Sequence, residues 1–325
     1  MNSRTVLFAE PEELRTVPGE PGAAAALRPL RPGMRRLLFA AAVLVLLAGI
    51  QLFVFTGQTG HFFAFTIANP LSAAFLGAGY LAAVAIEALA GRQARWANGR
   101  IAVPAVLVFT LLTLTVTLTH LGQFHLGPRF AIGTQAVTVA WIAIYVLVPA
   151  LMLILLLRQV RTPGLDPPRQ AGLPGWLYAL LAVQATVLVG LGTALFAAPV
   201  AAAPLWPWKL TPMMAQAIGA WLIGLGVAAG QMLAERDARR VRPAAAGSVL
   251  LAVFLTIALA RYPHQFHWGS ASGIAYLIIL ATMLLTGAMG LARGLPRAAR
   301  QSAPGLAADE ETKRQAGQSH YQSPA

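Results

Sequence analysis

The chain lacks cysteine altogether, and only 11% of its 325 residues are charged. The absence of cysteine excludes disulfides, thiolate nucleophiles, iron–sulfur clusters and thiolate zinc sites. The scarcity of charge argues against an ordinary soluble domain, in which about a quarter of the residues are charged. A Walker loop, a dinucleotide-binding fingerprint and an HExxH zinc motif are also missing from the sequence.

Apolar surface, in contrast, is in excess: 57% of the residues are hydrophobic and the mean hydropathy is +0.65. Eight apolar stretches have about the 20 residues that a membrane-spanning helix needs. They cover approximately 37–56, 71–90, 101–121, 138–158, 175–198, 213–233, 246–261 and 272–293. Because every backbone amide must be satisfied inside lipid, the sequence predicts an all-α polytopic membrane protein with eight transmembrane helices, whose first partner is the lipid bilayer.

One of these stretches resembles a strand, because threonines alternate at positions 113, 115, 117 and 119. A lone strand in lipid would leave its backbone hydrogen bonds unmade, so we predict a helix there. Threonine hydroxyls in such a helix can donate to the carbonyl groups of the preceding turn.

The basic residues predict the orientation of the chain. The net charge is +13, and only Lys209 and Lys313 are lysines; the remaining bases are arginine. Of the 24 bases, 21 fall in the two terminal segments and in the loops on one side of the predicted spans. The positive-inside rule therefore predicts that both termini lie in the cytoplasm. Because the topology accounts for the positive charge, the sequence does not predict binding of nucleic acid. The arginine-rich, alanine-rich composition indicates a bacterial protein, hence the cytoplasmic (inner) membrane.

Polar segments flank and divide the apolar spans. Residues 1–36 and 294–325 are predicted to be disordered cytoplasmic tails, and 159–174 a cytoplasmic linker. The linker separates a first four-helix unit, 37–158, from a second, 175–293.

These two units are related by one constant offset of 142 residues. At this offset Gln123-Phe124-His125-x-Gly127 matches Gln265-Phe266-His267-x-Gly269, and Pro70, Gly77 and Arg100 match Pro212, Gly219 and Arg242. Four spans is an even number, so the two units enter the membrane in the same orientation. We predict two parallel repeats related by an axis along the membrane normal, as in parallel-repeat transporters.

The repeated residues also predict local structure. Asn69-Pro70 and Thr211-Pro212 are typical of helix starts, with a capping oxygen followed by proline at the first helical position. Ala73-xxx-Gly77 and Ala215-xxx-Gly219 are pairs of small residues that allow close contact between helices. We therefore expect the second and sixth spans near the centre of the bundle.

Histidines on the extracytoplasmic side are the first candidate site. His125 and His267 are repeat equivalents, and His120 and His264 lie close by in the sequence. One hypothesis is a metal ion, a haem or a proton-linked switch held by these four residues. The favoured alternative is that they are interfacial histidines bonded to the outer turns, because no predicted outer loop contains a carboxylate that could orient a metal ligand.

Polar residues in or beside the spans form the second candidate site. Glu87 is the only acid inside a predicted span, and it either pairs with a nearby arginine or binds a coupling ion or proton. Four glutamines in or at the ends of spans, Gln51, Gln184, Gln216 and Gln231, either line a path or join helices by hydrogen bonds; we favour the second role. Gln123 and Gln265 of the repeated motif are further candidates for binding a ligand or a coupling ion.

Aromatic residues gather in two outer loops. The loop after the first span contains Phe62, Phe63 and Phe65, and its counterpart contains Trp206 and Trp208. They form either an access route for a lipid-like ligand or an ordinary aromatic belt at the membrane interface.

Two segments, Asn69-Pro70-Leu71-Ser72-Ala73-Ala74-Phe75-Leu76-Gly77-Ala78-Gly79-Tyr80 and Trp206-Pro207-Trp208-Lys209-Leu210-Thr211-Pro212, resemble those of uncharacterised multi-pass membrane proteins from actinobacteria and related bacteria. The resemblance covers the eight-span core. It implies a location and a topology and carries no activity.

Three functions remain open from the sequence. The favoured one is a transporter or channel for a small or lipid-like molecule, with its path between the repeats. The alternatives are a membrane redox or metal-binding protein that uses the outer histidines, and a non-catalytic component that docks a partner. A catalytic role is the less favoured, and the oligomeric state is open.

Overall fold

The computed structural model describes residues 27–170 and 172–294, and within these ranges the architecture is all-α. Eight helices are long and apolar enough to cross a membrane. They are α1 (Pro32–Val54), α3 (Pro70–Gly91), α5 (Ala102–Thr119), α6 (Ile132–Val160), α7 (Gly175–Ala197), α9 (Pro212–Glu235), α10 (Ala238–Arg261) and α11 (Ala271–Gly294). The chain is thus a multi-pass membrane protein with eight candidate spans, as predicted.

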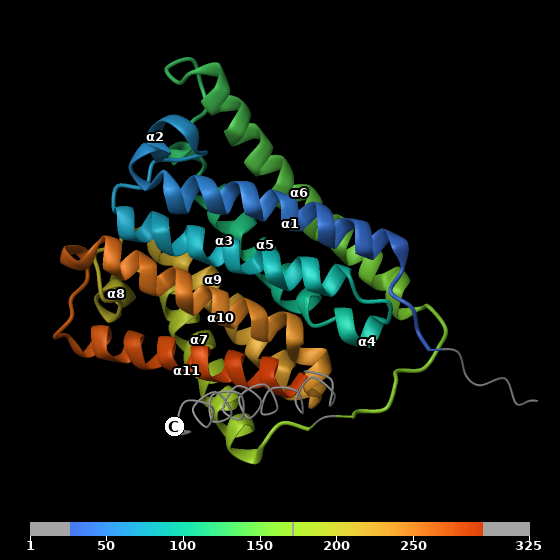
Figure 1. Cartoon of the computed structure of the whole chain (residues 1–325). Helices are drawn as coiled ribbons and strands as arrows, with labels where there is room; N and C mark the ends of the chain where they lie inside the picture. The colour runs from blue at the N-terminus through green and yellow to red at the C-terminus, as the bar shows by residue number, and fades with distance from the viewer. Residues whose placement is uncertain (1–26, 171, 295–325) are drawn as a thin grey trace, which may run out of the picture.

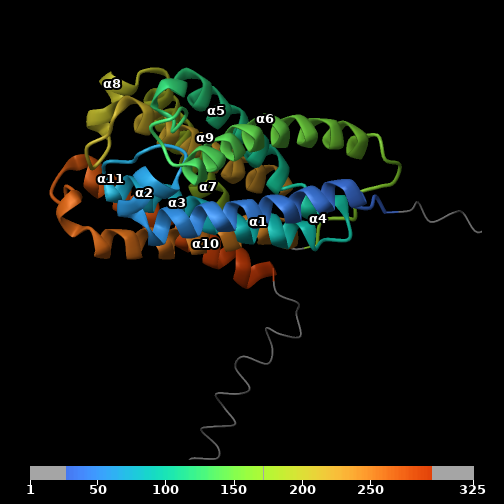
Figure 2. The same ribbon diagram turned by 90° about the horizontal axis from the view of Figure 1, so that it is seen from above.

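Short helical segments lie at the two ends of these spans. One end, which we call the histidine end, carries η1 (Thr56–Gln58), α2 (Thr59–Phe62), η2 (Leu121–Gln123), α8 (Pro199–Ala202), η3 (Ala203–Leu205) and η4 (Pro263–Gln265). The opposite end, the arginine end, carries α4 (Trp96–Gly99) and the segment between α6 and α7. Figures 1 and 2 show α2 and α4 at opposite ends of the helices.

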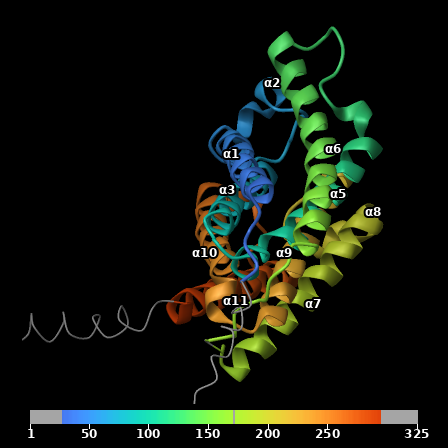
Figure 3. The ribbon, with the colours of Figure 1, turned by 90° about the vertical axis from the view of Figure 1, so that its right-hand side faces the viewer.

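The eight long helices form two layers of four. One layer has the order α1, α3, α10, α11, and the other has the order α6, α5, α9, α7; within each layer every helix packs on the next. Figure 3 shows the two layers as two adjacent columns. Each layer combines two helices from the first half of the chain with two from the second half. The halves are therefore interleaved, and neither forms a separate bundle.

Close helix contacts hold each layer together, as the small-residue pairs predicted. A Cβ atom on Gly77 would lie 2.5 Å from the backbone nitrogen of Phe53 in α1, and one on Gly219 would lie 2.7 Å from the carbonyl oxygen of Gly192 in α7. The predicted helix starts are confirmed too. Asn69 Oδ1 accepts from the Leu71 and Ser72 amides, and Thr211 Oγ1 accepts from the Met214 amide.

Several helix boundaries differ from the prediction. α10 begins at Ala238 rather than near 246, because Asp237 caps it and Pro243 is accommodated near its start. Arginines that the sequence places in a loop thus belong to its first turns. α6 begins at Ile132 rather than near 138, and α1 begins at Pro32 within the segment expected to be a tail. Residues 27–31, also expected to be tail, bond to the rest of the chain through the backbone amides of Arg28 and Leu30, whereas 1–26 and 295–325 lie outside the described residues.

The threonine-rich stretch is helical, and most of its hydroxyls behave as predicted. Thr115, Thr117 and Thr119 each donate to the carbonyl four residues earlier, at 2.7–3.0 Å. Thr113 Oγ1 is buried and has no hydrogen-bond partner. Helix α5 therefore satisfies three of these four hydroxyl groups within its own backbone.

Candidate functional site

A cavity lies between the two layers. It is lined by α1 and α3 from one layer and by α5, α6 and α9 from the other. It encloses about 730 Å³ of space not occupied by protein atoms, part of which is open to the surroundings. Its walls are almost entirely apolar, with alanine, leucine, isoleucine and valine side chains from all five helices. We call it the Glu87 cavity.

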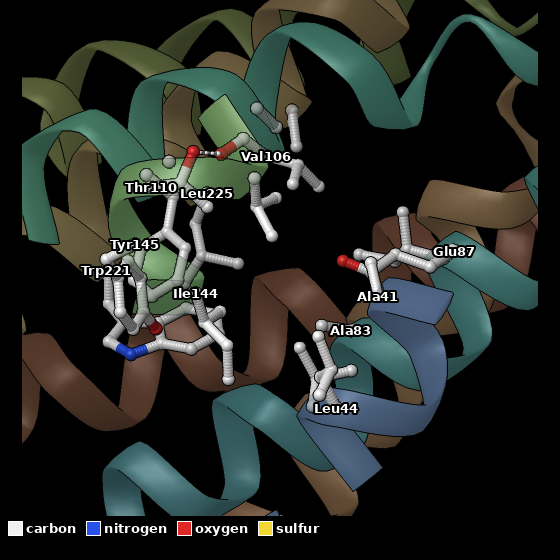
Figure 4. Close-up of a pocket in the computed structure, with 17 residues that line it drawn as sticks. Ala41, Leu44, Ala83, Glu87, Val106, Thr110, Ile144, Tyr145, Trp221 and Leu225 are labelled. Atoms are coloured by element: carbon white, nitrogen blue, oxygen red, sulfur yellow. Dashed lines mark hydrogen bonds between the residues drawn. The ribbon is translucent and has the colours of Figure 1, made fainter. Parts of the chain in front are cut away.

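Glu87 supplies the one carboxyl group of this cavity. Its side chain is 2% exposed, and Oε2 has no hydrogen-bond partner. Glu87 takes part in none of the ion pairs found among the described residues, so the nearby arginines do not neutralise it. Figure 4 shows an oxygen of the Glu87 carboxyl directed into the cavity, with Tyr145 and Trp221 on the opposite side.

Two other polar groups of the lining, on Thr110 and Tyr145, already have partners. Thr110 Oγ1 donates to the carbonyl oxygen of Val106 at 2.8 Å, as Figure 4 shows. The hydroxyl groups of Tyr145 and Tyr80 share a hydrogen bond of 2.5 Å. Glu87 is therefore the acidic group of this wall and remains available to a ligand, while the indole N–H of Trp221 has no acceptor among the described residues.

This combination of apolar walls and one unpartnered carboxyl restricts what the cavity can hold. A buried carboxyl without a partner is unfavourable, and a ligand that donates a hydrogen bond or carries a positive charge would remove that penalty. The surrounding walls favour a hydrocarbon chain. The chemistry thus matches an amphiphile with a donor or cationic end.

Gln184 and Gln216 lie away from the Glu87 cavity, and both join helices. Gln184 donates to Thr282 and accepts from Thr286, so it links α7 to α11. Gln216 of α9 donates to the Phe196 carbonyl at the end of α7 and binds His120. These contacts fit the role of helix connection that the sequence favoured.

His120 and Gln123 form one small network at the histidine end. His120 Nε2 lies 2.6 Å from Gln216 Oε1, an atom that only accepts, so this ring nitrogen donates. Its Nδ1 atom then accepts from Gln123 Nε2 at 3.1 Å. Both ring nitrogens of His120 are therefore used within the protein.

His125 is buried and is likewise bonded through both ring nitrogens. Nδ1 donates to the carbonyl of Phe63 at 2.8 Å, and Nε2 pairs with Thr66 Oγ1 at 2.9 Å. His125 thus fixes the loop that follows α1, which agrees with the interpretation of interfacial histidines.

The equivalent residues of the second half are placed differently. His264 and His267 are exposed, and Gln265 Oε1 accepts from Asn69 Nδ2 at 3.3 Å. Within the part of the chain that the structure describes, no three histidine, aspartate or glutamate side chains form a group that could hold a metal ion.

The aromatic loops are not a lipid-facing belt. Phe63, Phe65, Trp206 and Trp208 are all buried, whereas Phe62 is exposed. Phe63 and Phe65 pack edge-to-face on each other and on Trp141, and Trp206 packs in the same way on Trp208. These residues form aromatic cores beneath the histidine end.

An ionic cluster at the arginine end was not foreseen from the sequence. Glu235, at the end of α9, binds Arg100 through two hydrogen bonds of 2.5 and 2.8 Å, and Arg240 at 3.2 Å. Arg100 also pairs with Asp166 at 2.5 Å. The hydrogen bond with Glu235 is the main reason that the pKa of Arg100 lies above its usual value. The one available signal was Glu235 next to a run of arginines, but its main partner is 135 residues away.

No protein-family model, curated protein or solved structure matches this chain. The sequence resembles uncharacterised multi-pass membrane proteins, and the structure supports this resemblance only in its architecture, that of a multi-pass helical membrane protein. The cavity and its carboxyl are therefore the features of the molecule from which a function can be inferred.

Proposed function

We propose that this protein binds a lipid-like molecule inside the membrane, and that it acts as a transporter for that molecule. The observation that carries the proposal is Glu87: a buried carboxyl with an unpartnered oxygen, facing a cavity whose walls are otherwise apolar. The ligand class that fits is a single-chain amphiphile whose polar end is cationic or donates a hydrogen bond.

The position of the cavity favours transport over storage. Its walls come from both halves of the chain, since α9 of the second half contributes Trp221 and Leu225 opposite α1 and α3. Sliding of one layer on the other would therefore change the shape of the cavity. Small relative movements of packed helices are a common basis of transport and gating.

We further propose that the halves are two parallel repeats, with boundaries near 37–158 and 175–293. The pairing of helices supports this. α1 packs on α3 as α7 packs on α9, and α3 packs on α10 as α9 packs on α5. If each helix of the first half is replaced by its equivalent in the second half, and the reverse, one layer becomes the other. This is expected for a twofold axis along the membrane normal.

The proposed location is the inner membrane of a bacterium of the actinobacterial type, with both termini in the cytoplasm. The arginine end, which holds α4 and the α9–α10 turn, would then face the cytoplasm. Glu87 lies one helical turn from the end of α3 on that side.

The proposal is tested by blocking the cavity from α6. Val148 lines it, whereas Val146 on the same helix is 45% exposed and faces outward. In proteoliposomes, the probe is a single-chain quaternary ammonium amphiphile with a chain-attached nitrobenzoxadiazole, and dithionite reports its movement between leaflets. Val148→Trp and Glu87→Gln should each slow protein-dependent movement, and Val146→Trp should leave it unchanged. Movement that is equal in all four proteins would overturn the proposal.

A further inference from the structure

A second cavity lies between the same two layers, closer to the histidine end. Its volume is about 540 Å³, part of which is open to the surroundings, and it is lined by α3, α10 and α11 from one layer and by α7 and α9 from the other. Its walls are again mainly apolar, and they also include the indole of Trp206 and the phenol ring of Tyr276. We call it the Trp206 cavity.

Trp206 carries a hydrogen-bond donor without a partner. Its side chain is 4% exposed, and Nε1 is buried with no acceptor. Three other indoles in the same fold do have acceptors: Trp141 donates to Thr117, Trp208 to Ser72 and Trp268 to the Pro263 carbonyl. Buried indole N–H groups usually donate a hydrogen bond, so the unpaired N–H of Trp206 is available to a ligand that carries an acceptor.

Tyr276 adds a second polar group to the same cavity. Its ring packs edge-to-face on Trp206 with 5.5 Å between centroids, and its hydroxyl has no hydrogen-bond partner within the described ranges. Ser272, one turn earlier on α11, also lines the cavity. In contrast to the Glu87 cavity, this wall contains no carboxylate and offers hydrogen-bond donors.

We infer that the Trp206 cavity is a second ligand site, which takes an acyl-chain molecule whose polar end accepts hydrogen bonds, such as a carboxylic ester. The chain would occupy the apolar walls, and the ester carbonyl would accept from Trp206 Nε1 and the Tyr276 hydroxyl. The lining has no carboxylate that could neutralise a cationic end, so the two cavities prefer opposite polar ends.

The two sites are adjacent through one residue. Leu225 of α9 lines the Glu87 cavity, the Trp206 cavity and a central cavity of about 470 Å³ between them. A molecule that moves through the protein could therefore occupy the two sites in succession. This connection rests on the proposed function, whereas binding at the Trp206 cavity does not.

The test uses a long-chain fatty acid methyl ester with a diazirine near the end of its chain. Full-length protein in nanodiscs is irradiated with this probe, and labelled peptides are identified by mass spectrometry. We expect labelling on α7 and α11 that falls about tenfold in the double variant Trp206→Phe, Tyr276→Phe, because two hydrogen bonds are lost while an aromatic side chain stays at each position.

Matched variants make the outcome decisive. Ile279 lines the cavity and Ile278 is 58% exposed on the same helix. Ile279→Trp should abolish the labelling and Ile278→Trp should not. Labelling that survives both the double variant and Ile279→Trp overturns the inference. Glu87→Gln should leave ester labelling unchanged, so the labelling tests the Trp206 cavity independently of the Glu87 proposal. Loss of ester labelling in Glu87→Gln would contradict the inference that the Trp206 cavity is a separate site.

Discussion

Glu235 and Glu87 are both buried acids near the arginine end, but their surroundings are opposite. Glu235 is 1% exposed and receives hydrogen bonds from Arg100, Arg240 and Gln231. Glu87 is 2% exposed, faces a cavity and has an oxygen without a partner. The protein thus neutralises one acid completely and leaves the other available.

The difference separates a structural role from a binding role. Glu235 joins the end of α9 to Arg100 beside α4, and Arg100 in turn holds Asp166 of the α6–α7 segment. An acid that served only structure would be expected to have partners of this kind. Among the described residues Glu87 has no such partner and contacts an apolar cavity, which supports the proposal that it binds a ligand.

The largest expected effect is loss of the Glu235 cluster. Glu235→Gln leaves Arg240 buried without its counter-charge, and breaking a buried ion pair in this way costs about 3–5 kcal/mol. The free energy of unfolding, measured by SDS titration in mixed micelles, should fall accordingly. Asp166→Asn is the control. The Asp166 side chain is 31% exposed in its ion pair with Arg100, so this substitution should lower the free energy of unfolding by no more than about 1 kcal/mol.

The next effect concerns the tight contact that holds α3 beside the cavity. Gly77→Ala places a Cβ atom 2.5 Å from the Phe53 backbone nitrogen, and overpacking of this kind costs about 1–3 kcal/mol. Gly230→Ala, in α9, meets nothing within 4 Å and should stabilise the helix by about 0.5–1 kcal/mol. Equal melting temperatures for the two variants would mean that α3 is not fixed against α1.

Glu87→Gln should change the free energy of unfolding far less than Glu235→Gln does. No hydrogen bond or ion pair is removed from the described structure, so the free energy of unfolding should change by less than about 1 kcal/mol. The same SDS titration measures this. A loss as large as that of Glu235→Gln would remove the distinction between the two acids.

The side of the membrane on which the Glu235 cluster lies can be determined without a stability change. The chain has no cysteine, so single cysteines at Leu126 and Ala94, both exposed, report on the histidine end and the arginine end. An impermeant maleimide should label Leu126→Cys in intact cells and Ala94→Cys only after permeabilisation. The reverse pattern would place the arginine end outside.

Local features of the fold were predictable from sequence, and long-range pairings were not. Eight apolar runs gave eight helices because lipid allows few alternatives, and the capping residues Asn69 and Thr211 fixed two helix starts. α10 was predicted too short because Arg239, Arg240 and Arg242 resemble a loop. The binding of Arg240 to Glu235 is what makes such charges compatible with a helix start.

The candidate site was predicted only in part. Glu87 stood out as an intramembrane acid, but a hydropathy pattern does not reveal whether arginines reach it. The Trp206 and Tyr276 contact joins residues 70 positions apart in different elements, so no local pattern indicates that they share a cavity. The interleaving of the two halves was equally hidden, because it depends on which helices pack together.

The most direct test of the Glu87 site is the affinity difference between two probes of equal chain length, a long-chain amine and the corresponding carboxylic acid, in nanodiscs. Both measurements use an Ile279→Trp background, in which the Trp206 cavity is filled and cannot take up the acid. With Glu87 intact, the protein should bind the amine at least about tenfold more tightly, since a charge-assisted hydrogen bond is worth about 1.5–3 kcal/mol. The preference should disappear when Glu87→Gln is added. Equal affinities for the two probes with Glu87 intact, or a preference that persists in Glu87→Gln, would contradict the assignment of Glu87 as the ligand-binding carboxyl.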